Sequence, residues 1–174
     1  MVREGFANAV KFNVGCAVVL AGSDSDKGHI DEIVKGLEIW GIPFDVRICS
    51  AHKQPEELMG IVREYDRLEG SLVYIAVAGG TDALSGTVSF NSTRPVISCP
   101  PGDGINMSCL TNPPGSSNAY VQKPANVARF VAQMFSTVNH GYRDRLLEEA
   151  RKKREKLTVA DAKLNDEYAR GEAK

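Results

Sequence analysis

The stretch CSAHKQP at residues 49–55 decides the fold when it is taken together with GSDSD at 22–26 and AGG at 78–80. Each stretch follows a short apolar run typical of a buried parallel strand, and each precedes a helix-like segment. Small, hydroxylated and ionisable residues therefore occupy three strand-to-helix turns. In an open α/β sheet, such turns lie at the carboxyl ends of the strands, where this type of sheet binds ligands.

Strand-like and helix-like segments alternate along most of the chain. Short apolar runs predict strands at 16–21, 46–49, 72–77, 95–99 and 119–121. Apolar residues spaced three and four positions apart predict the helices between and after them, at 26–40, 55–65, around 84–88 and at 124–138. We therefore predict an α/β fold with a three-layer, doubly wound parallel sheet, flavodoxin-like or Rossmann-like, and C-terminal helices.

The composition fits one domain followed by a C-terminal extension. The chain has 174 residues, of which 43% are hydrophobic, so we place a single α/β domain at 1–140. Residues 143–156 are charge-dense, which predicts an exposed helix within a charged helical extension at 141–174. This helix projects freely or packs on a neighbouring subunit, and we expect fraying after residue 158. Residues 102–118, rich in Gly, Pro, Ser and Asn, predict a lid or a packing arm.

Charge and cysteine usage limit the partners and the binding sites that we expect for this chain. A formal net charge of -1 and a pI near 6.3 provide no field that would gather nucleic acid or an anionic membrane, so we expect a small molecule or another copy as partner. Residues 1–14 hold no long apolar run, so we expect neither signal peptide nor membrane span, and a cytoplasmic protein. The cysteines lack metal-ligand spacing, so we expect no metal site, and Cys16, Cys49 and Cys99 are expected to be buried.

The turn at 22–26 has the features of an anion site. Its backbone N–H groups open a helix, and Ser23 and Ser25 add hydroxyl donors, so phosphate or a phosphorylated sugar is the expected ligand. Asp26 can accept hydrogen bonds from ribose hydroxyls. The alternative is that these side chains only cap the following helix.

The turn at 49–55 offers proton transfer and a positive charge. His52 lies just past a strand end, where an imidazole can take up or release a proton near neutral pH. Lys53 offers an ammonium group for an anion, or is a solvated charge at a helix start. Gly79 and Gly80 allow a ligand ring to approach the backbone closely, although glycine is also common in ordinary turns.

Together these stretches closely resemble the 5-aminoimidazole ribonucleotide carboxylase family of purine biosynthesis. The resemblance covers roughly residues 14–139, and its pieces come in the family's order. They are GSDSD at 22–26, SAHK at 50–53, AGG at 78–80 with ALSG at 83–86, PVISCPP at 95–101 and AQMF at 132–135. The resemblance implies that the 1–140 domain is catalytic.

The resemblance also implies roles for individual residues. His52 is the expected catalytic residue, which moves the proton at ring carbon 4 of the substrate. The expected substrate-binding residues are Ser23, Ser25, Ser50 and Lys53 at the phosphate, Asp26 at the ribose, Gly79, Gly80, Ala83 and Leu84 at the ring and carbon dioxide, and Gly22 and Ala51 beside them. The resemblance implies no cofactor and no metal, with carbon dioxide as co-substrate.

Two classes exist in this family. One moves a carboxylate from the exocyclic nitrogen of N5-carboxyaminoimidazole ribonucleotide to carbon 4, and the other adds carbon dioxide directly to aminoimidazole ribonucleotide. The first class typically has Ser-Ala-His-Arg and a second histidine, whereas this chain has Lys53 after His52 and Ala83 at the place of that histidine. The sequence therefore resembles the direct-carboxylating class II. It departs from that class at Gly80 and Thr111, where relatives carry arginine.

Direct carboxylation is thus the favoured function, and three alternatives stay open. They are the mutase reaction, a diverged paralogue that acts on another phosphorylated heterocycle, and a non-catalytic flavodoxin-like binding module. The resemblance, the exposed helix and the long loop also predict a homotetramer or homo-octamer with active sites near subunit contacts. We expect no nucleic-acid or membrane partner.

Overall fold

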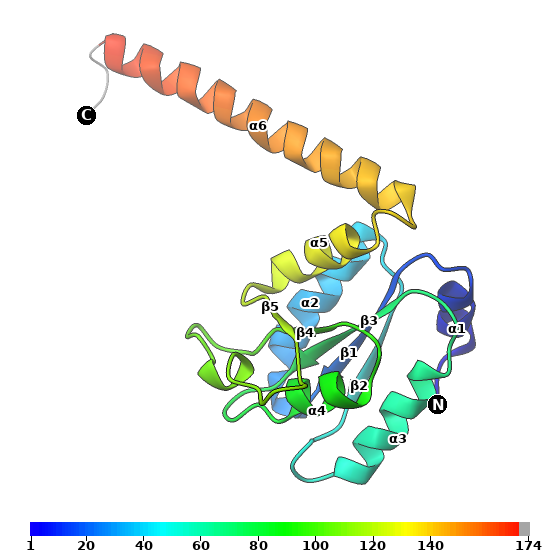
Figure 1. The fold of residues 1–174 in the computed structure, drawn as a ribbon. Coiled ribbons are helices and arrows are strands. Elements are labelled where there is room, and N and C mark those ends of the chain that lie inside the picture. The colour runs from blue at the N-terminus through cyan, green and yellow to red at the C-terminus, as the bar shows by residue number, and fades with distance from the viewer. Residues whose placement is uncertain (171–174) are drawn as a thin grey trace.

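The protein is an α/β domain from which one long helix projects (Figure 1). A computed structural model describes residues 1–170. Its strands are β1 (Cys16–Ala21), β2 (Phe44–Ile48), β3 (Leu72–Val77), β4 (Val96–Ser98) and β5 (Ala119–Tyr120). Its helices are α1 (Glu4–Lys11), α2 (Lys27–Trp40), α3 (Pro55–Asp66), α4 (Leu84–Asn91), α5 (Pro124–Met134) and α6 (His140–Ala169), with short 3₁₀ helices η1 (Asp24–Asp26) and η2 (Met107–Cys109).

The strands form one parallel sheet in the order β2-β1-β3-β4-β5. Helices α2 and α5 cover one face of the sheet, and α1, α3 and α4 cover the other (Figure 1). Successive strand residues point to opposite faces, so the strands β1, β3 and β4 each contribute to both cores. The predicted three-layer, doubly wound, flavodoxin-like fold is confirmed.

Strand β1 shows how the sheet separates two hydrophobic cores. Val19 is fully buried in the core that contains Leu37 of α2 and Val131 of α5. Its neighbour Val18 is fully buried in the opposite core with Leu58 of α3. All residues of β1 and β3 are buried, because these central strands have helices on both faces.

Several element boundaries differ from the sequence prediction. Strand β2 begins at Phe44, before the predicted start at residue 46, because the buried Asp45 interrupts the apolar run. Helix α5 ends at Met134 rather than at residue 138. Helix α1 was not predicted, since Phe6 and Val10 are its only buried residues and two positions make a weak periodic signal.

The predicted fraying after residue 158 is wrong, because α6 continues to Ala169. Near its start the helix is anchored to the domain: the Tyr142 hydroxyl donates to the carbonyl oxygen of Gly15 at 2.9 Å, and Glu149 pairs with Arg129 of α5 at 3.2 Å. Farther out, ion pairs one turn apart such as Lys163–Glu167 support the helix. Residues 171–174 of the predicted extension lie outside the described residues.

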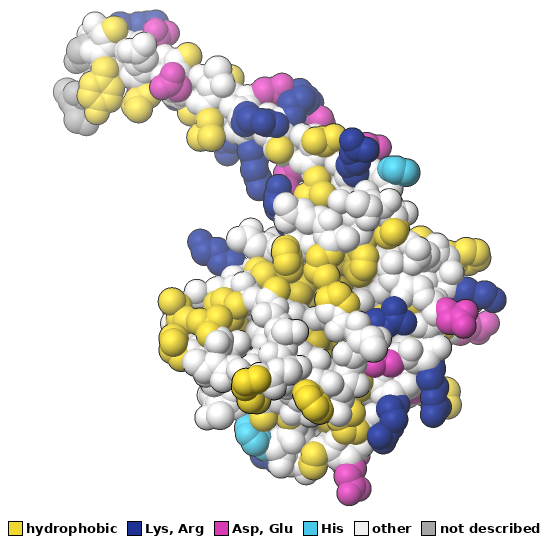
Figure 2. All heavy atoms as spheres, viewed as in Figure 1, with side chains coloured by type: hydrophobic (Ala, Val, Ile, Leu, Met, Phe, Trp, Pro, Cys, Tyr) yellow, Lys and Arg dark blue, Asp and Glu magenta, His cyan; other side chains and the backbone are white. Residues whose placement is uncertain are grey.

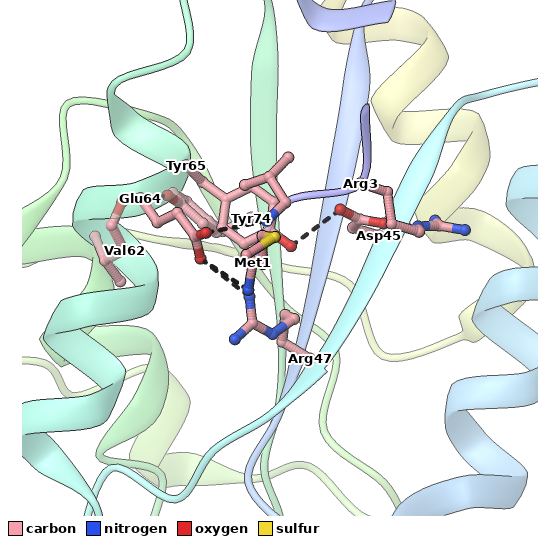
Figure 3. Close-up of polar contacts among 9 residues, drawn as sticks. Met1, Arg3, Asp45, Arg47, Val62, Glu64, Tyr65 and Tyr74 are labelled. Carbon is pink, nitrogen blue, oxygen red and sulfur yellow. Dashed lines mark hydrogen bonds and ion pairs between the residues drawn. The ribbon is translucent and has the colours of Figure 1, made fainter. Parts of the chain in front are cut away.

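A polar cluster covers the outer edge of the sheet beside β2 (Figure 3). The carboxylate of Asp45, 3% exposed, accepts a hydrogen bond from the Tyr65 hydroxyl at 3.0 Å and pairs with Arg3. Arg47 pairs with Glu64 at 3.3 Å and lies 5.9 Å from the centre of the Tyr65 ring. Burial raises the pKa of Tyr65 to about 12, so its hydroxyl stays a donor at neutral pH. The buried carboxylate therefore has the partners that its burial requires.

Replacing Tyr65 by phenylalanine tests this cluster. Tyr65→Phe removes the buried donor to Asp45, so we expect the free energy of unfolding to fall by about 1.5 to 3 kcal/mol. Urea denaturation at matched protein concentration measures the change. Tyr168→Phe is the control, because Tyr168 is 68% exposed on α6. Equal stabilities of the two variants would contradict the role given to this hydrogen bond.

Candidate active site

The carboxyl ends of β1, β2 and β3 lie side by side and are joined by main-chain hydrogen bonds. The N–H of Cys49 donates to the carbonyl oxygen of Ala21 at 2.8 Å. The N–H of Gly22 donates to the carbonyl oxygen of Val77 at 2.9 Å. The turns at 22–26, 50–54 and 78–82 therefore start from one edge of the sheet, where the sequence placed them.

The turn after β1 presents two linked hydroxyls. The Oγ atoms of Ser23 and Ser25 are 2.8 Å apart, and the Ser23 Oγ accepts a hydrogen bond from the Ser25 N–H at 3.2 Å. Ser23 thus caps η1, as the capping alternative held. Asp26 precedes α2 but its side chain makes no capping hydrogen bond. The carboxylate of Asp26 is therefore not used to start the helix.

The turn after β2 presents the imidazole and the ammonium group. It is closed by hydrogen bonds from the Gln54 N–H to the Ser50 carbonyl oxygen at 2.8 Å and from the Lys53 N–H to the Ser50 Oγ at 3.3 Å. Pro55 in the first turn of α3 ends this turn, as predicted. His52 and Lys53 are both exposed, whereas Ala51 is half-buried against the core. The backbone is thus fixed while the two reactive groups reach the surface.

The turn after β3 is held by the loop at 102–118. Gly80 has a φ of 60°, in the left-handed region that glycine tolerates best. Its carbonyl oxygen accepts a hydrogen bond from the Asn106 Nδ2 at 2.9 Å, and the Asp82 N–H donates to the Ser108 Oγ at 2.8 Å. The loop at 102–118 therefore packs on this turn.

Asp82 has a role that the sequence analysis missed. Its side chain is buried, and its Oδ1 accepts hydrogen bonds from the N–H groups of Leu84 at 2.8 Å and Ser85 at 3.0 Å, which caps α4. Its Oδ2 accepts the Cys109 thiol at 3.2 Å, and burial together with this carboxylate raises the pKa of Cys109 to about 12. An aspartate two residues before a helix start is a recognisable capping signal. Asp82 thus joins α4 to the loop.

Two cavities border this edge of the sheet. One, of about 590 Å³, lies between α4 and the loop and includes Ala83 and Phe90. The other, of about 340 Å³, includes His29 and Lys123 near the starts of α2 and α5. Neither cavity is lined by His52, which lies on the open surface. The side chain of Leu84 is 1% exposed and packs in the core.

Residues 1–170 contain no cluster of three or more His, Cys, Asp or Glu side chains placed to hold a metal ion. In the same part of the chain no helix has the length and apolarity needed to cross a bilayer.

Residues 16–156 match the family model described as AIR carboxylase. The chain belongs to this family. A phosphoribosylaminoimidazole carboxylase from Archaeoglobus fulgidus is 35% identical over 85% of this chain and 84% of its own length. The bifunctional phosphoribosylaminoimidazole carboxylase/phosphoribosylaminoimidazole succinocarboxamide synthetase of Rattus norvegicus is 40% identical over 75% of this chain. The match spans only 32% of the rat protein, so this chain corresponds to about a third of it.

The family includes both named activities. An N5-carboxyaminoimidazole ribonucleotide mutase from Methanocaldococcus jannaschii is 29% identical over 86% of this chain and 98% of its own. Among solved structures, Treponema denticola PurE superposes with a TM-score of 0.80 and 33% identity, over 86% of this chain and 98% of that one. The chain is therefore a member of a carboxylase and mutase enzyme family of purine biosynthesis.

Replacing Asp82 by alanine tests the link between α4 and the loop. Asp82→Ala removes the cap of α4 and leaves buried donors without a partner, so we expect the free energy of unfolding to fall by about 2 kcal/mol. Faster amide hydrogen exchange at residues 79–86 should accompany the loss. Asp166→Ala, at an exposed position of α6, is the control. Unchanged exchange at residues 79–86 would contradict the assignment.

Proposed function

We propose that this protein is a phosphoribosylaminoimidazole carboxylase. It adds carbon dioxide to carbon 4 of 5-aminoimidazole ribonucleotide and forms 4-carboxyaminoimidazole ribonucleotide in the cytoplasm. The observation that carries the proposal is the exposed His52 and Lys53 on a rigid turn, beside the serine-rich turn at 22–26, in a chain of the AIR carboxylase family. The reaction needs no cofactor, and carbon dioxide is the co-substrate.

The substrate is bound in three parts. The phosphate binds to hydroxyls, backbone N–H groups and an ammonium group, and the ribose binds to a carboxylate. The aminoimidazole ring and carbon dioxide lie against the turn after β3 and the start of α4. The residues are Ser23, Ser25, Ser50 and Lys53 for the phosphate, Asp26 for the ribose, and Gly79, Gly80 and Ala83 for the ring and carbon dioxide, with Gly22 and Ala51 beside them.

The chemistry follows from the substrate and one proton-transfer group. The aminoimidazole ring is an enamine-like carbon nucleophile, so carbon 4 can attack carbon dioxide once both are held together. A carbon–carbon bond forms between carbon 4 and carbon dioxide. The π electron pair of one carbon–oxygen double bond moves to its oxygen, which gives a carboxylate. Carbon 4 is then tetrahedral and carries both a proton and the carboxylate. His52 takes this proton and the ring becomes aromatic again.

The mutase reaction is the second candidate, because a relative bears that name. Lys53 and Ala83 favour direct carboxylation, as argued from the sequence. The two can be separated by giving the purified protein either aminoimidazole ribonucleotide with bicarbonate or N5-carboxyaminoimidazole ribonucleotide. Formation of product from the first pair supports the proposal. Product from the second substrate alone would assign the mutase, and product from neither would favour a diverged paralogue.

The first prediction for this reaction concerns His52. His52→Asn keeps a hydrogen-bonding side chain but cannot carry a proton at neutral pH, so we expect turnover to fall by about 100-fold or more with substrate affinity within a few fold. Exchange of the carbon 4 proton should fall in parallel. His140→Asn, at the exposed first residue of α6, is the matched control. Turnover near that of the unmodified protein would end the assignment.

Lys53 should show the opposite pattern. Lys53→Met removes a charge-assisted contact to the phosphate, so we expect the Kd of aminoimidazole ribonucleotide to rise by about tenfold or more, with a smaller effect on turnover. Isothermal titration calorimetry measures the Kd. Lys156→Met, on an exposed part of α6, provides the control. Equal affinities of the two variants would remove Lys53 from the binding site.

The protein should also be a homotetramer or homo-octamer. Phe90 of α4 and Ile105, Met107 and Leu110 of the loop at 102–118 are each at least half exposed, so α4 and the loop present large apolar side chains to solvent. Such a surface is typical of a subunit contact. Multi-angle light scattering should therefore give a mass about four or eight times that of the 18.9 kDa chain. A monodisperse mass near that of one chain would refute this prediction.

A further inference from the structure

Helix α6 carries a regular stripe that the described part of the chain leaves uncovered. Beyond Glu149 the helix extends away from the domain, and Figure 2 shows apolar side chains spaced along it among lysines and arginines. Six positions alternate four and three residues apart, which is the spacing of a two-helix seam. This α6 seam consists of Ala150, Arg154, Leu157, Asp161, Leu164 and Tyr168.

The apolar members of the seam face solvent. Leu157 is 69% exposed, Leu164 is 55% exposed and Tyr168 is 68% exposed. Helices in proteins gain most of their stability from packing an apolar face, so a projecting helix with such a face lacks its main stabilising contact. The family match ends at residue 156. Four of the six seam residues, Leu157, Asp161, Leu164 and Tyr168, therefore lie beyond the matched range, and the seam is independent of the proposed reaction.

Two charged residues in the seam decide how it pairs. Among residues 1–170 neither Arg154 nor Asp161 forms an ion pair, although neighbouring charges such as Glu149 and Lys153 do. Arg154 and Asp161 are seven residues apart, about 10 Å along one helix, so they do not meet within it. In a parallel in-register pair each would face its own copy, and like charges repel. In an antiparallel pair each can lie within one layer of the opposite charge on the second copy.

We propose that α6 pairs in antiparallel fashion with α6 of a second copy of this chain. Leu157 then lies level with Asp161 of the second copy, Arg154 with Leu164, and Ala150 with Tyr168. Arg154 is one layer, about 4.5 Å along the axis, from Asp161 of the second copy. Symmetry repeats this ion pair at the other end of the seam. The α6 seam of one copy thus packs against the α6 seam of another copy.

The domain sets this register. Leu146 packs against the core and Glu149 pairs with Arg129, so α6 leaves the domain at this point. In the proposed register Arg170 of the second copy lies level with Glu148, just outside the domain. If the second copy moved seven residues toward the domain, its Arg170 would lie level with residue 141, beside the buried Tyr142. A shift outward would remove Ala150 and Arg154 from the seam.

Cysteine cross-linking tests the orientation in the full chain. Ala160 and Glu167 each precede a seam residue, so Ala160→Cys and Glu167→Cys are a matched pair. In the antiparallel register the two copies of position 160 are offset by about 3 Å along the axis, and the two copies of position 167 by about 24 Å. A short bis-maleimide should therefore link Ala160→Cys into a dimer and leave Glu167→Cys unlinked. The unmodified chain gives the background level of cross-linking, because its four cysteines are buried.

Equal cross-linking of both variants would indicate parallel pairing, and absence of cross-linking at position 160 would indicate no pairing. Either result would overturn the proposal. Charge reversal then tests the register. In the Ala160→Cys protein, Arg154→Asp or Asp161→Arg alone should lower the cross-linked fraction by about threefold to fivefold, and the two together should restore it.

Lys156→Asp is the matched control for the reversals, because it changes the same type of charge away from the seam and should leave cross-linking unchanged. If the cross-linked fraction of the double variant is as low as that of the single variants, the proposed register is wrong. An anionic membrane is the competing occupant, since residues 151–156 are rich in Lys and Arg. Flotation with phosphatidylserine vesicles should leave the protein unbound. Vesicle binding that abolishes the cross-link at position 160 would show that a membrane, and not a second copy, covers the seam.

Discussion

The structure depends on one constraint, which is that all strands of the sheet run in the same direction. Parallel strands bring their carboxyl ends to one edge, and main-chain hydrogen bonds such as that from Gly22 to Val77 continue the ladder into the turns. Turns that are about thirty residues apart in sequence thereby become neighbours. The turns that we propose for phosphate binding and for proton transfer can then contact one ligand.

The third turn of the site depends on a different kind of support. The turn after β3 has little structure of its own, and the loop at 102–118 fixes it through Asn106 and Ser108. Asp82 connects the same loop to the start of α4 through the Cys109 thiol. The loop also carries the exposed side chains of Ile105 and Met107. Packing of another copy on this loop would therefore act directly on the turn that we assign to the ring and carbon dioxide.

Helix α6 divides into a part that belongs to the domain and a part that does not. Tyr142 and Glu149 attach its first turns to the sheet and to α5. As far as residue 170, the contacts of the outer turns lie within the helix itself, such as the ion pair between Lys163 and Glu167. The helix pairing that we propose would explain their apolar stripe, which the domain does not cover. The α/β domain and the projecting part of α6 thus have separate roles in our proposals: the domain binds the ligand, and the projecting part binds a second copy.

The sequence by itself determined which segments are strands and helices, because apolar periodicity is a local property of the chain. It also determined the residues of the proposed site, since a histidine, a lysine and several serines follow strand-like runs, and it predicted the flavodoxin-like fold. It did not show that Asp82 binds the Cys109 thiol, or that Asn106 holds Gly80. These contacts join residues more than twenty positions apart, and only the path of the loop in space decides which of them meet. The short α1 was likewise decided by tertiary structure, because two buried residues carry it, and the anchors Tyr142 and Glu149 fix the start of α6 on the domain.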